Sequence, residues 1–394
     1  MLKVSLLENI SPEQTAVAYS KASRASRLQA PGAPATGGQV RGIEDIAKNL
    51  TPAQAAEFLK KWVVEERHIS IAEHIPVSLF IEDVPLIVAT WLEHFPGVAA
   101  LARATRHVKV LRAYYVPPPH AHIAQKPDIF NTYKVTAESL LDSYERTLPI
   151  LMQHMAPTRA YEVARLLLPL GTLTNVAITT NAAVLLKVLA EGVVHPLRAL
   201  RDSCEEMRKV AAQIAPTLFG EYPSPQPSPA RGEGVISSPR LSLDGRGMPD
   251  SGRAGEGVSV LGSSPSTDER HSFFTFELFP DFPTLRDLLH LKKGVLTLTP
   301  YTTAYDVVLP KEVHDLGLVD EFSATLHKAG FAEERIASFH AHAAQHLIPM
   351  AFRQRVLLTL SKQDMIDIQA HMEEENESEE FLAMWRILYA AASQ

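Results

Sequence analysis

The chain has 394 residues, of which 46% are hydrophobic and 21% charged, and its formal net charge is −7 at pH 7. That composition is typical of a folded globular protein, and the acidic balance argues against general nucleic-acid binding. The single cysteine, Cys204, excludes an intrachain disulfide and a cysteine-based zinc cluster. The start "MLKVSLLENISPEQ" is not a secretory signal and no apolar run is long enough for a membrane helix, so we expect a cytoplasmic protein with no membrane partner.

Two helix starts are marked near the N-terminus. Ser11 and Thr51 each offer an N-cap hydroxyl, followed by a proline at the first helical position and a glutamine three residues after the cap. The second start opens an amphipathic helical pattern through "AQAAEFLKKWVVEE". Further on, "IPVSLFIEDVP" is rich in β-branched residues and fits either a strand or the entry of a buried helix.

The sequence "HISIAEH" lies just before that apolar run. It places His68, Ser70, Glu73 and His74 within seven residues at a helix end. The spacing allows Ser70 to share a helical face with Glu73 or His74. Such a cluster can hold a ligand, and it can equally cap a helix or supply surface polarity.

The stretch "WLEHFPGVAALARATRH", residues 91–107, raises a sharper question. A helical pattern runs into Phe95-Pro96-Gly97, and a run of small residues then carries Arg103 and Arg106. From these residues alone it could be a cofactor site, the remnant of one, or only a helix and a loop.

Residues 133–213 show a mostly helical pattern in several segments. Arg165 precedes the apolar "LLLP", and Asn181 and Arg201 are further polar candidates. An arginine in such a place usually reaches solvent or an acidic neighbour, and binding of a phosphate or carboxylate is the alternative.

The sharpest change of composition lies at residues 223–267. Those 45 residues contain 7 Pro, 8 Gly and 10 Ser, which leaves little to bury. We therefore predict three parts: a first domain at 1–220, a disordered linker or insertion at 221–271, and a second domain at 272–394.

The two flanks share a weak internal repeat. "ARLLLPLGTLTNVAITTNAAVLLKVL" at 164–189 aligns without gaps with "AQHLIPMAFRQRVLLTLSKQDMIDIQ" at 344–369, and both are expected to continue as helix after the proline. The second copy is expected to begin near Lys293 and to lack an equivalent of residues 51–107. A chance match of two apolar helices is the alternative.

The histidines of "FHAHAAQH" include His342 and His346, whose spacing would place both imidazoles on one helical face. No carboxylate stands inside the motif, so we expect no metal there or elsewhere in the chain.

In order and spacing, these motifs resemble those of the flavin-dependent thymidylate synthases. "HISIAEH" matches the family's His-x-Ser-x-x-Glu-His, "FIEDV" follows it, and "ARLLLPLGTLTNVAITTNAAVLL" is similar to Ala-Arg-x-x-Leu-Pro followed by Thr-x-Asn-x-Arg-x-Leu. The resemblance covers about residues 4–219. It implies a helix-rich α+β fold with a mixed or antiparallel sheet, and here a second, partial copy of that unit.

The resemblance also implies a function for the region of residues 91–107. The family places Arg-His-Arg and two serines here, which help to hold FAD and the nucleotide. Counted from "FIEDV", Arg-His-Arg falls on residues 94–96 and the serines on Ala99 and Ala104, while the closing arginine matches Arg106. A shift of one residue aligns His94 with the family's histidine, and in either alignment both arginines and both serines are lost.

Two functions follow as expectations. The family reaction is the methylation of dUMP to dTMP with methylenetetrahydrofolate, FAD and reduced nicotinamide. The matched positions imply cofactor binding by His68, Ser70, His74, Arg106 and Asn181, and substrate binding by Arg165 and Arg201. Because the arginine motif is degraded, FAD binding is doubtful, and the alternative is a noncatalytic scaffold or a binder of another small ligand. The family's tetramer further implies a homodimer of this chain, in which the second copy packs on the first through the segments around Pro169 and Pro349.

Overall fold

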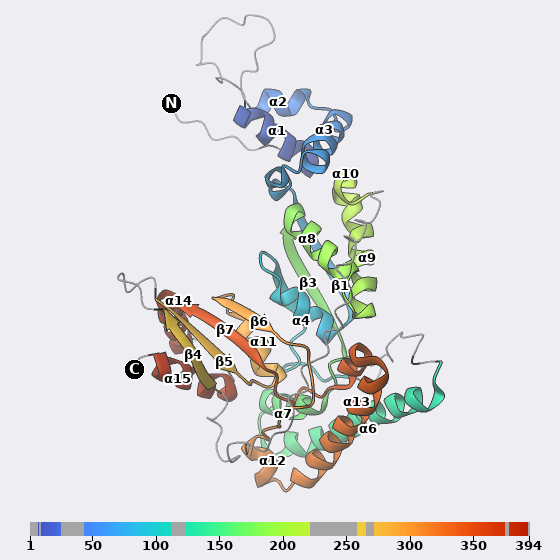
Figure 1. The fold of residues 1–394 in the computed structure, drawn as a ribbon, viewed down its shortest axis with the longest axis vertical. Helices are drawn as coiled ribbons and strands as arrows, with labels where there is room; N and C mark the ends of the chain where they lie inside the picture. The colour runs from blue at the N-terminus through green and yellow to red at the C-terminus, as the bar shows by residue number, and fades with distance from the viewer. Residues whose placement is uncertain are drawn as a thin grey trace, which may run out of the picture. The chain divides into compact units, whose positions relative to one another are not determined.

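The computed structural model describes residues 7, 9–24, 43–111, 123, 125–220, 258–264, 272–374 and 378–392. Within them the chain forms two compact units that do not follow chain order. The first unit comprises residues 1–84, 95–102 and 175–233, and the second comprises 85–94, 103–174 and 234–394. The fold is helix-rich α+β with small antiparallel sheets, as the resemblance implied (Figure 1). No described helix is long and apolar enough to cross a bilayer.

The first unit is built from short helices and a three-stranded sheet. Its elements are α1 (Pro12–Arg24), α2 (Ile43–Asn49), α3 (Pro52–Leu59), the π-helical η1 (Lys60–Glu65), the 3₁₀-helical η2 (Ile69–His74), β1 (Pro76–Pro85), β2 (Ala99–Ala102), β3 (Leu173–Asn181), α8 (Ala182–Val193), α9 (Arg198–Ile214) and α10 (Pro216–Phe219). The sheet order is β1-β3-β2. Thr51 caps α3 as its sequence predicted, with Gln54 completing a reciprocal capping box.

The second unit contains the remaining elements. They are α4 (Leu86–His94), α6 (Pro127–His154), α7 (Pro157–Ala164), η4 (Arg165–Leu167), β4 (Val258–Ser264), β5 (Phe273–Leu278), α11 (Phe282–His290), β6 (Val295–Leu298), α12 (Lys311–Asp315), α13 (Val319–Ala344), η6 (Gln345–Leu347), β7 (Val356–Ser361), α14 (Lys362–Glu374) and α15 (Glu379–Ala392). Its sheet has the order β4-β5-β7-β6.

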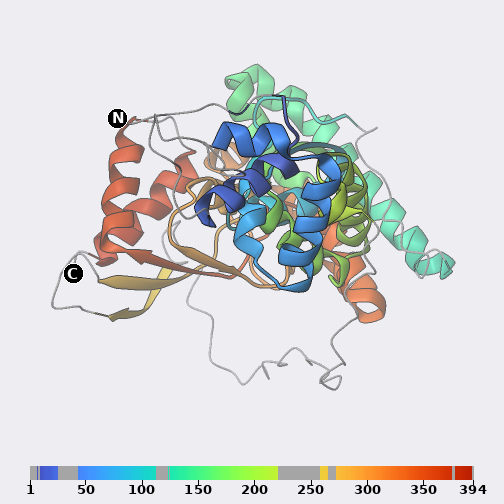
Figure 2. The same cartoon turned by 90° about the horizontal axis from the view of Figure 1, so that it is seen from above.

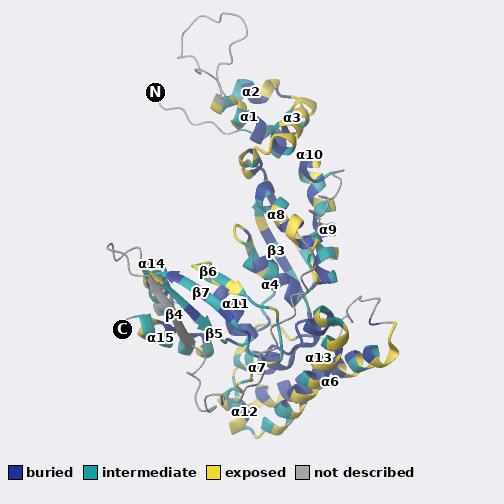
Figure 3. Cartoon of the chain, viewed as in Figure 1, coloured by how far each residue is buried: buried dark blue, intermediate teal, exposed yellow. Residues whose placement is uncertain are grey.

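One face of this second sheet carries a hydrophobic core. Inward residues of β5 and β7, such as Phe276 and Leu358, pack against α11, α14 and α15, where Phe381 and Trp385 are fully buried. Figure 2 shows α14 and α15, in red, on one face of the strands. In Figure 3 the inner strands β3 and β7 alternate between buried and intermediate residues along most of their length.

The segments around Pro169 and Pro349 cross as an antiparallel bridge in the second unit. Leu170 N donates to Ile348 O at 2.9 Å, and Met350 N donates to Leu168 O at 2.9 Å. Gly171 N likewise donates to the carbonyl of His346, and Ala351 N to that of Leu166. The pattern is reciprocal, so the predicted pairing of these two segments is confirmed.

Three sequence-based expectations were wrong. The chain does not continue as helix directly after Pro169 and Pro349, because the strands β3 and β7 precede the helices α8 and α14. In β3 the buried residues Thr174, Val176 and Ile178 alternate with less buried ones, and this period-2 pattern was obscured by the helical propensity of the segment. The second copy does not begin near Lys293, since β5, α11 and β6 repeat the order of β1, α4 and β2.

The third error concerns the segment at 221–271. The strand β4 lies inside it and pairs with β5 from Val258 opposite Leu278 to Ser264 opposite Phe273. As the edge strand of the sheet, β4 pairs with β5 alone. The rest of 221–271 lies outside the described residues, and the division into domains at 220 and 272 stays a prediction.

Candidate functional site

The sequence "HISIAEH" forms the short helix η2 in the first unit, with its polar side chains exposed. His68, Ser70 and His74 all face solvent. The ring of Tyr19 meets that of His74 edge-on at 5.5 Å, and Trp62 lies 5.4 Å from His68. These side chains remain accessible to a ligand.

Asn181 lies next to this helix, as the sequence motifs implied. The backbone N–H of Ala182 donates to the carbonyl of Ile75 at 2.9 Å, which joins the end of η2 to the start of α8. The Asn181 side-chain oxygen, however, accepts from Val184 N at 3.0 Å and caps α8. Its acceptor is therefore occupied by the helix that follows it.

Arg201, also in the first unit, holds the loop before α9. Its Nη1 donates to the carbonyls of His195 at 2.6 Å and Pro196 at 3.0 Å. The guanidinium thus bonds two backbone carbonyls of the turn that leads into α9.

Arg165 and Arg106 belong to the second unit. Arg165 is 7% exposed, and its Nη1 donates to Thr105 Oγ1 at 3.3 Å. Its Nε has no hydrogen-bond partner among the described residues, and burial lowers the pKa of this guanidinium. Arg106, the neighbour of Thr105, is half-buried in a turn.

Residues 91–107 form the end of α4, a turn, the strand β2 and a second turn. Helix α4 ends at His94 because Pro96 cannot continue it, and Gly97 then adopts a left-handed φ of +82°. Alanine there would suffer both that strain and a Cβ contact of 3.0 Å with Val184. Pro96 and Gly97 therefore fix the turn between α4 and β2.

Within α4, Glu93 is 1% exposed and forms an ion pair that sequence reasoning missed. Arg286 of α11 donates to it in a bidentate manner, from Nη2 to Oε1 at 2.6 Å and from Nε to Oε2 at 3.1 Å. Burial alone would raise the pKa of Glu93, but the charge of Arg286 outweighs it and lowers the pKa to about 2. The signal was an arginine inside the apolar run "FPTLRDLL", which the sequence reading passed over.

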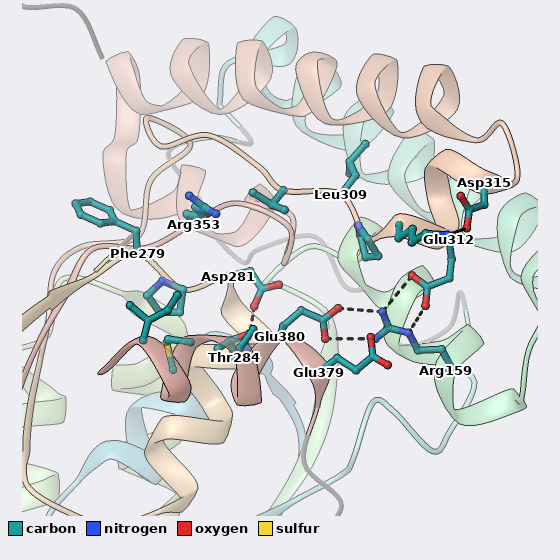
Figure 4. Close-up of a pocket in the computed structure, with 17 residues that line it drawn as sticks. Arg159, Phe279, Asp281, Thr284, Leu309, Glu312, Asp315, Arg353, Glu379 and Glu380 are labelled. Atoms are coloured by element: carbon teal, nitrogen blue, oxygen red, sulfur yellow. Dashed lines mark hydrogen bonds and ion pairs between the residues drawn. The ribbon is translucent and has the colours of Figure 1, made fainter. Parts of the chain in front are cut away.

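The second unit also has a cavity of about 560 Å³. It is lined by the loop before α11, by residues 308–312, by α15 and by Arg159 (Figure 4). Arg159 bonds two carboxylates of its wall: its Nε donates to Glu312 at 2.7 Å and its Nη2 to Glu380 at 3.0 Å. Sequence reasoning did not find this site, because its parts are far apart in the chain.

Among the residues that the structure describes, no three His, Cys, Asp or Glu side chains are grouped to hold a metal ion. The expectation of a metal-free protein stays a prediction.

Exposed η2 histidines beside the capped helix α8, in a helix-rich α+β fold, fit the thymidylate-synthase-like class that the sequence motifs indicated. The family model described as thymidylate synthase complementing protein matches residues 5–224, and the chain belongs to this family of flavin-dependent thymidylate synthases.

Individual relatives are distant. Two flavin-dependent thymidylate synthases, from Streptomyces coelicolor and Streptomyces avermitilis, are each 22% identical over 199 residues, covering 46% of this chain and 80% of the relative. A solved structure, the UMP/dUMP methylase PolB from Streptomyces cacaoi bound with 5-Br dUMP, is 18% identical with a TM-score of 0.40, covering 55% of this chain and 92% of that one.

Proposed function

We propose that this chain is a noncatalytic member of the family, kept as a scaffold subunit, which no longer binds FAD or converts dUMP to dTMP. The observation that carries the proposal is the buried pair of Glu93 with Arg286. The family resemblance assigns arginines to this part of the chain, and here it supplies a buried carboxylate that binds an arginine of α11.

The described residues do not fit the pyrophosphate of FAD. Such an anion needs guanidinium groups or free donors, whereas at the end of α4 Glu93 is buried against Arg286 and Pro96 has no backbone N–H. Each charge-assisted hydrogen bond that is lost costs about 1.5–3 kcal/mol, so losing several should abolish micromolar binding.

The nucleotide-binding positions support the same proposal. Arg165 is covered by protein, and Arg201 donates to two backbone carbonyls. A dUMP phosphate would meet an Arg165 that protein covers, and an Arg201 whose Nη1 is already bonded to the backbone.

A second candidate is the family reaction itself. It is favoured by the side chains of His68, Ser70 and His74, which are exposed and therefore accessible to a ligand. In the family reaction the flavin supplies the redox chemistry, and residues of this chain would only bind and orient the nucleotide.

Two measurements on the purified full-length chain decide between these functions. We expect no flavin absorption after FAD is added and removed by gel filtration. We also expect no dTMP from dUMP, methylenetetrahydrofolate, FAD and NADPH. The Streptomyces coelicolor enzyme serves as the positive control. Stoichiometric FAD, or dTMP formation that His74→Ala abolishes, would overturn the proposal.

We further propose that the chain assembles as a homodimer. The crossing at Pro169 and Pro349 already joins two sets of similar elements within one chain, so two chains would supply four, the number in the family's tetramer. Light scattering coupled to gel filtration should give twice the monomer mass, and a stable monomer at micromolar concentration would refute this assembly.

A further inference from the structure

The cavity in the second unit has the size of a small-molecule site (Figure 4). Its volume of about 560 Å³ lies within the usual range for ligand pockets, roughly 300–1,000 Å³. None of the residues that the resemblance assigns to FAD or dUMP lines it. What this cavity binds is therefore a separate question from whether the family reaction survives.

At one end of the cavity the charged side chains bond one another. The Arg159 guanidinium donates to both oxygens of Glu312 and to both oxygens of Glu380. Lys311 forms an ion pair with Asp315. Figure 4 shows Arg159 between the two glutamates that it bonds. Arg159 and Lys311 therefore hold the wall of the cavity together, and the charge of an anionic ligand must be met elsewhere.

The two remaining carboxylates of the lining are Asp281 and Glu379. Asp281 caps α11 by accepting from Thr284 N at 2.9 Å, and burial raises its pKa, which disfavours the charged form. Glu379 is exposed, and Figure 4 shows it at the same end as Arg159, away from Arg353. Neither carboxylate forms an ion pair with Arg353.

Arg353 is the third cationic side chain of the lining, and it is half-buried. Among the residues that the structure describes, none forms a hydrogen bond or ion pair with its guanidinium, whereas nearby Arg355 pairs with Glu277 at 2.5 Å. In the alignment of the two similar segments Arg353 stands opposite Leu173, so the shared architecture accepts an apolar residue at this position. The fold therefore does not account for the charge of Arg353.

Much of the remaining lining is apolar. Phe279 lies at the Arg353 end of the cavity in Figure 4, and its ring packs edge-on against Tyr305 at 5.1 Å. The loop before α12 and the helix α15 supply the other apolar side chains: Val308, Leu309, Pro310, Ala383, Met384 and Ile387. A ligand that fills this space must bring an apolar body as well as a group for Arg353.

We propose that this cavity binds a small monocarboxylate with an apolar body, such as an arylalkanoate or a short fatty acid. Its carboxylate accepts two hydrogen bonds from the Arg353 guanidinium, and its apolar body contacts Phe279 and Leu309. The planar guanidinium matches the two oxygens of a carboxylate in geometry. One arginine compensates one negative charge, whereas a phosphate dianion would bring a second charge into a lining that already holds five carboxylates.

Calorimetric titration of the full chain tests the ligand class. The probes are 3-phenylpropanoate and octanoate, each compared with its own neutral amide. Acetate keeps the charge without the body, and phenyl phosphate brings a second charge. We expect at least one of the two carboxylates to bind, and its amide and acetate to bind at least about 10-fold more weakly, because each loses one set of contacts.

Two outcomes of this titration would overturn the proposal. The first is that neither carboxylate binds at millimolar concentration. The second is that the amide, acetate or phenyl phosphate binds as tightly as the better carboxylate.

Variants locate the site. Arg353→Gln should weaken binding roughly 10- to 100-fold, and Arg353→Lys should fall between it and the wild type, because lysine keeps the charge but not the paired donors. Arg386→Gln is the matched control, since Arg386 is an exposed arginine of α15 outside the cavity lining. Thermal unfolding checks that each variant is folded. Equal affinity for the wild type and Arg353→Gln would refute the site even if a carboxylate binds elsewhere.

Discussion

The two sheets of this protein are built to the same plan from different residues. In the first, β2 pairs with β3 from Ala99 opposite Thr179 to Ala102 opposite Val176. In the second, β6 pairs with β7 from Val295 opposite Thr359 to Leu298 opposite Val356. The strand orders β1-β3-β2 and β5-β7-β6 also correspond, with β4 added beside β5.

Polar contacts that serve the fold recur at matching places in both halves. Ser78 and Thr179 form a cross-strand hydroxyl contact at 3.2 Å, and Thr275 and Thr359 form one at 3.0 Å. Asn181 caps α8 after β3, and Ser361 caps α14 after β7 by accepting from Asp364 N at 3.0 Å. Where a polar residue and its counterpart make the same structural contact, the fold explains the residue without a role in ligand binding.

Other polar residues have no such counterpart. Arg165 aligns with Gln345, and both are buried, but only the first carries a charge. His68, Ser70 and His74 belong to η2, and the described part of the second half has no equivalent before β5. The architecture therefore explains Asn181 as a helix cap. It does not explain His68, Ser70 and His74.

The largest expected effect is at the ion pair between α4 and α11, which is not one of the contacts that recur in both halves. Glu93→Ala leaves the Arg286 charge buried without its partner and should destabilise the fold by about 3–5 kcal/mol. The double variant Glu93→Leu, Arg286→Met removes both charges and should recover most of that loss. Urea unfolding of the three proteins measures this, and a loss below about 1 kcal/mol in Glu93→Ala would contradict it.

The same pair predicts how stability depends on pH. The pKa of Glu93 is lowered from 4.5 to about 2, so the stabilisation is complete above about pH 4.5 and is lost as the pH falls toward 2. The size is roughly 3 kcal/mol, since one pKa unit corresponds to about 1.4 kcal/mol. Glu93→Gln should flatten the acid limb of the stability curve, whereas parallel acid limbs for both proteins would show that Glu93 is not the titrating group.

How much of this could be read from the sequence depended on the range of the interaction. Local signals were sufficient to predict the capping box at Thr51 and the helix at "HISIAEH". The crossing at Pro169 and Pro349 was predicted from the alignment of the two similar segments. The partner of Glu93 and the walls of the cavity come from segments far apart in the chain, which no local pattern connects. The strand β4 was missed because it lies in a segment rich in Pro, Gly and Ser, and its partner β5 lies outside that segment.

An intermediate effect is expected where the two segments cross. A Cβ at Gly171 would lie 2.8 Å from the backbone oxygen of His346, which cannot move without disturbing the bridge. Gly171→Ala should therefore destabilise by about 1–3 kcal/mol. At the matching position Ala351 already carries a Cβ, so Ala351→Gly should cost only about 1 kcal/mol. If thermal unfolding ranked the two variants in the opposite order, the crossing would not be as tight as described.

The smallest effects concern the caps that both halves share. Asn181→Ala and Ser361→Ala each remove one side-chain acceptor from a helix N-terminus, so each should destabilise by about 1 kcal/mol. The exchange variants Asn181→Ser and Ser361→Asn should both stay close to the wild type, because serine and asparagine cap about equally well. Chemical unfolding compares the four variants with the wild type, and calorimetric titration with dUMP gives a second readout. If Asn181→Ala changed dUMP affinity without changing stability, Asn181 would be a ligand-binding residue, and its correspondence with Ser361 would not explain it. If both alanine variants lose the same stability and neither changes dUMP binding, Asn181 serves as a helix cap, as Ser361 does.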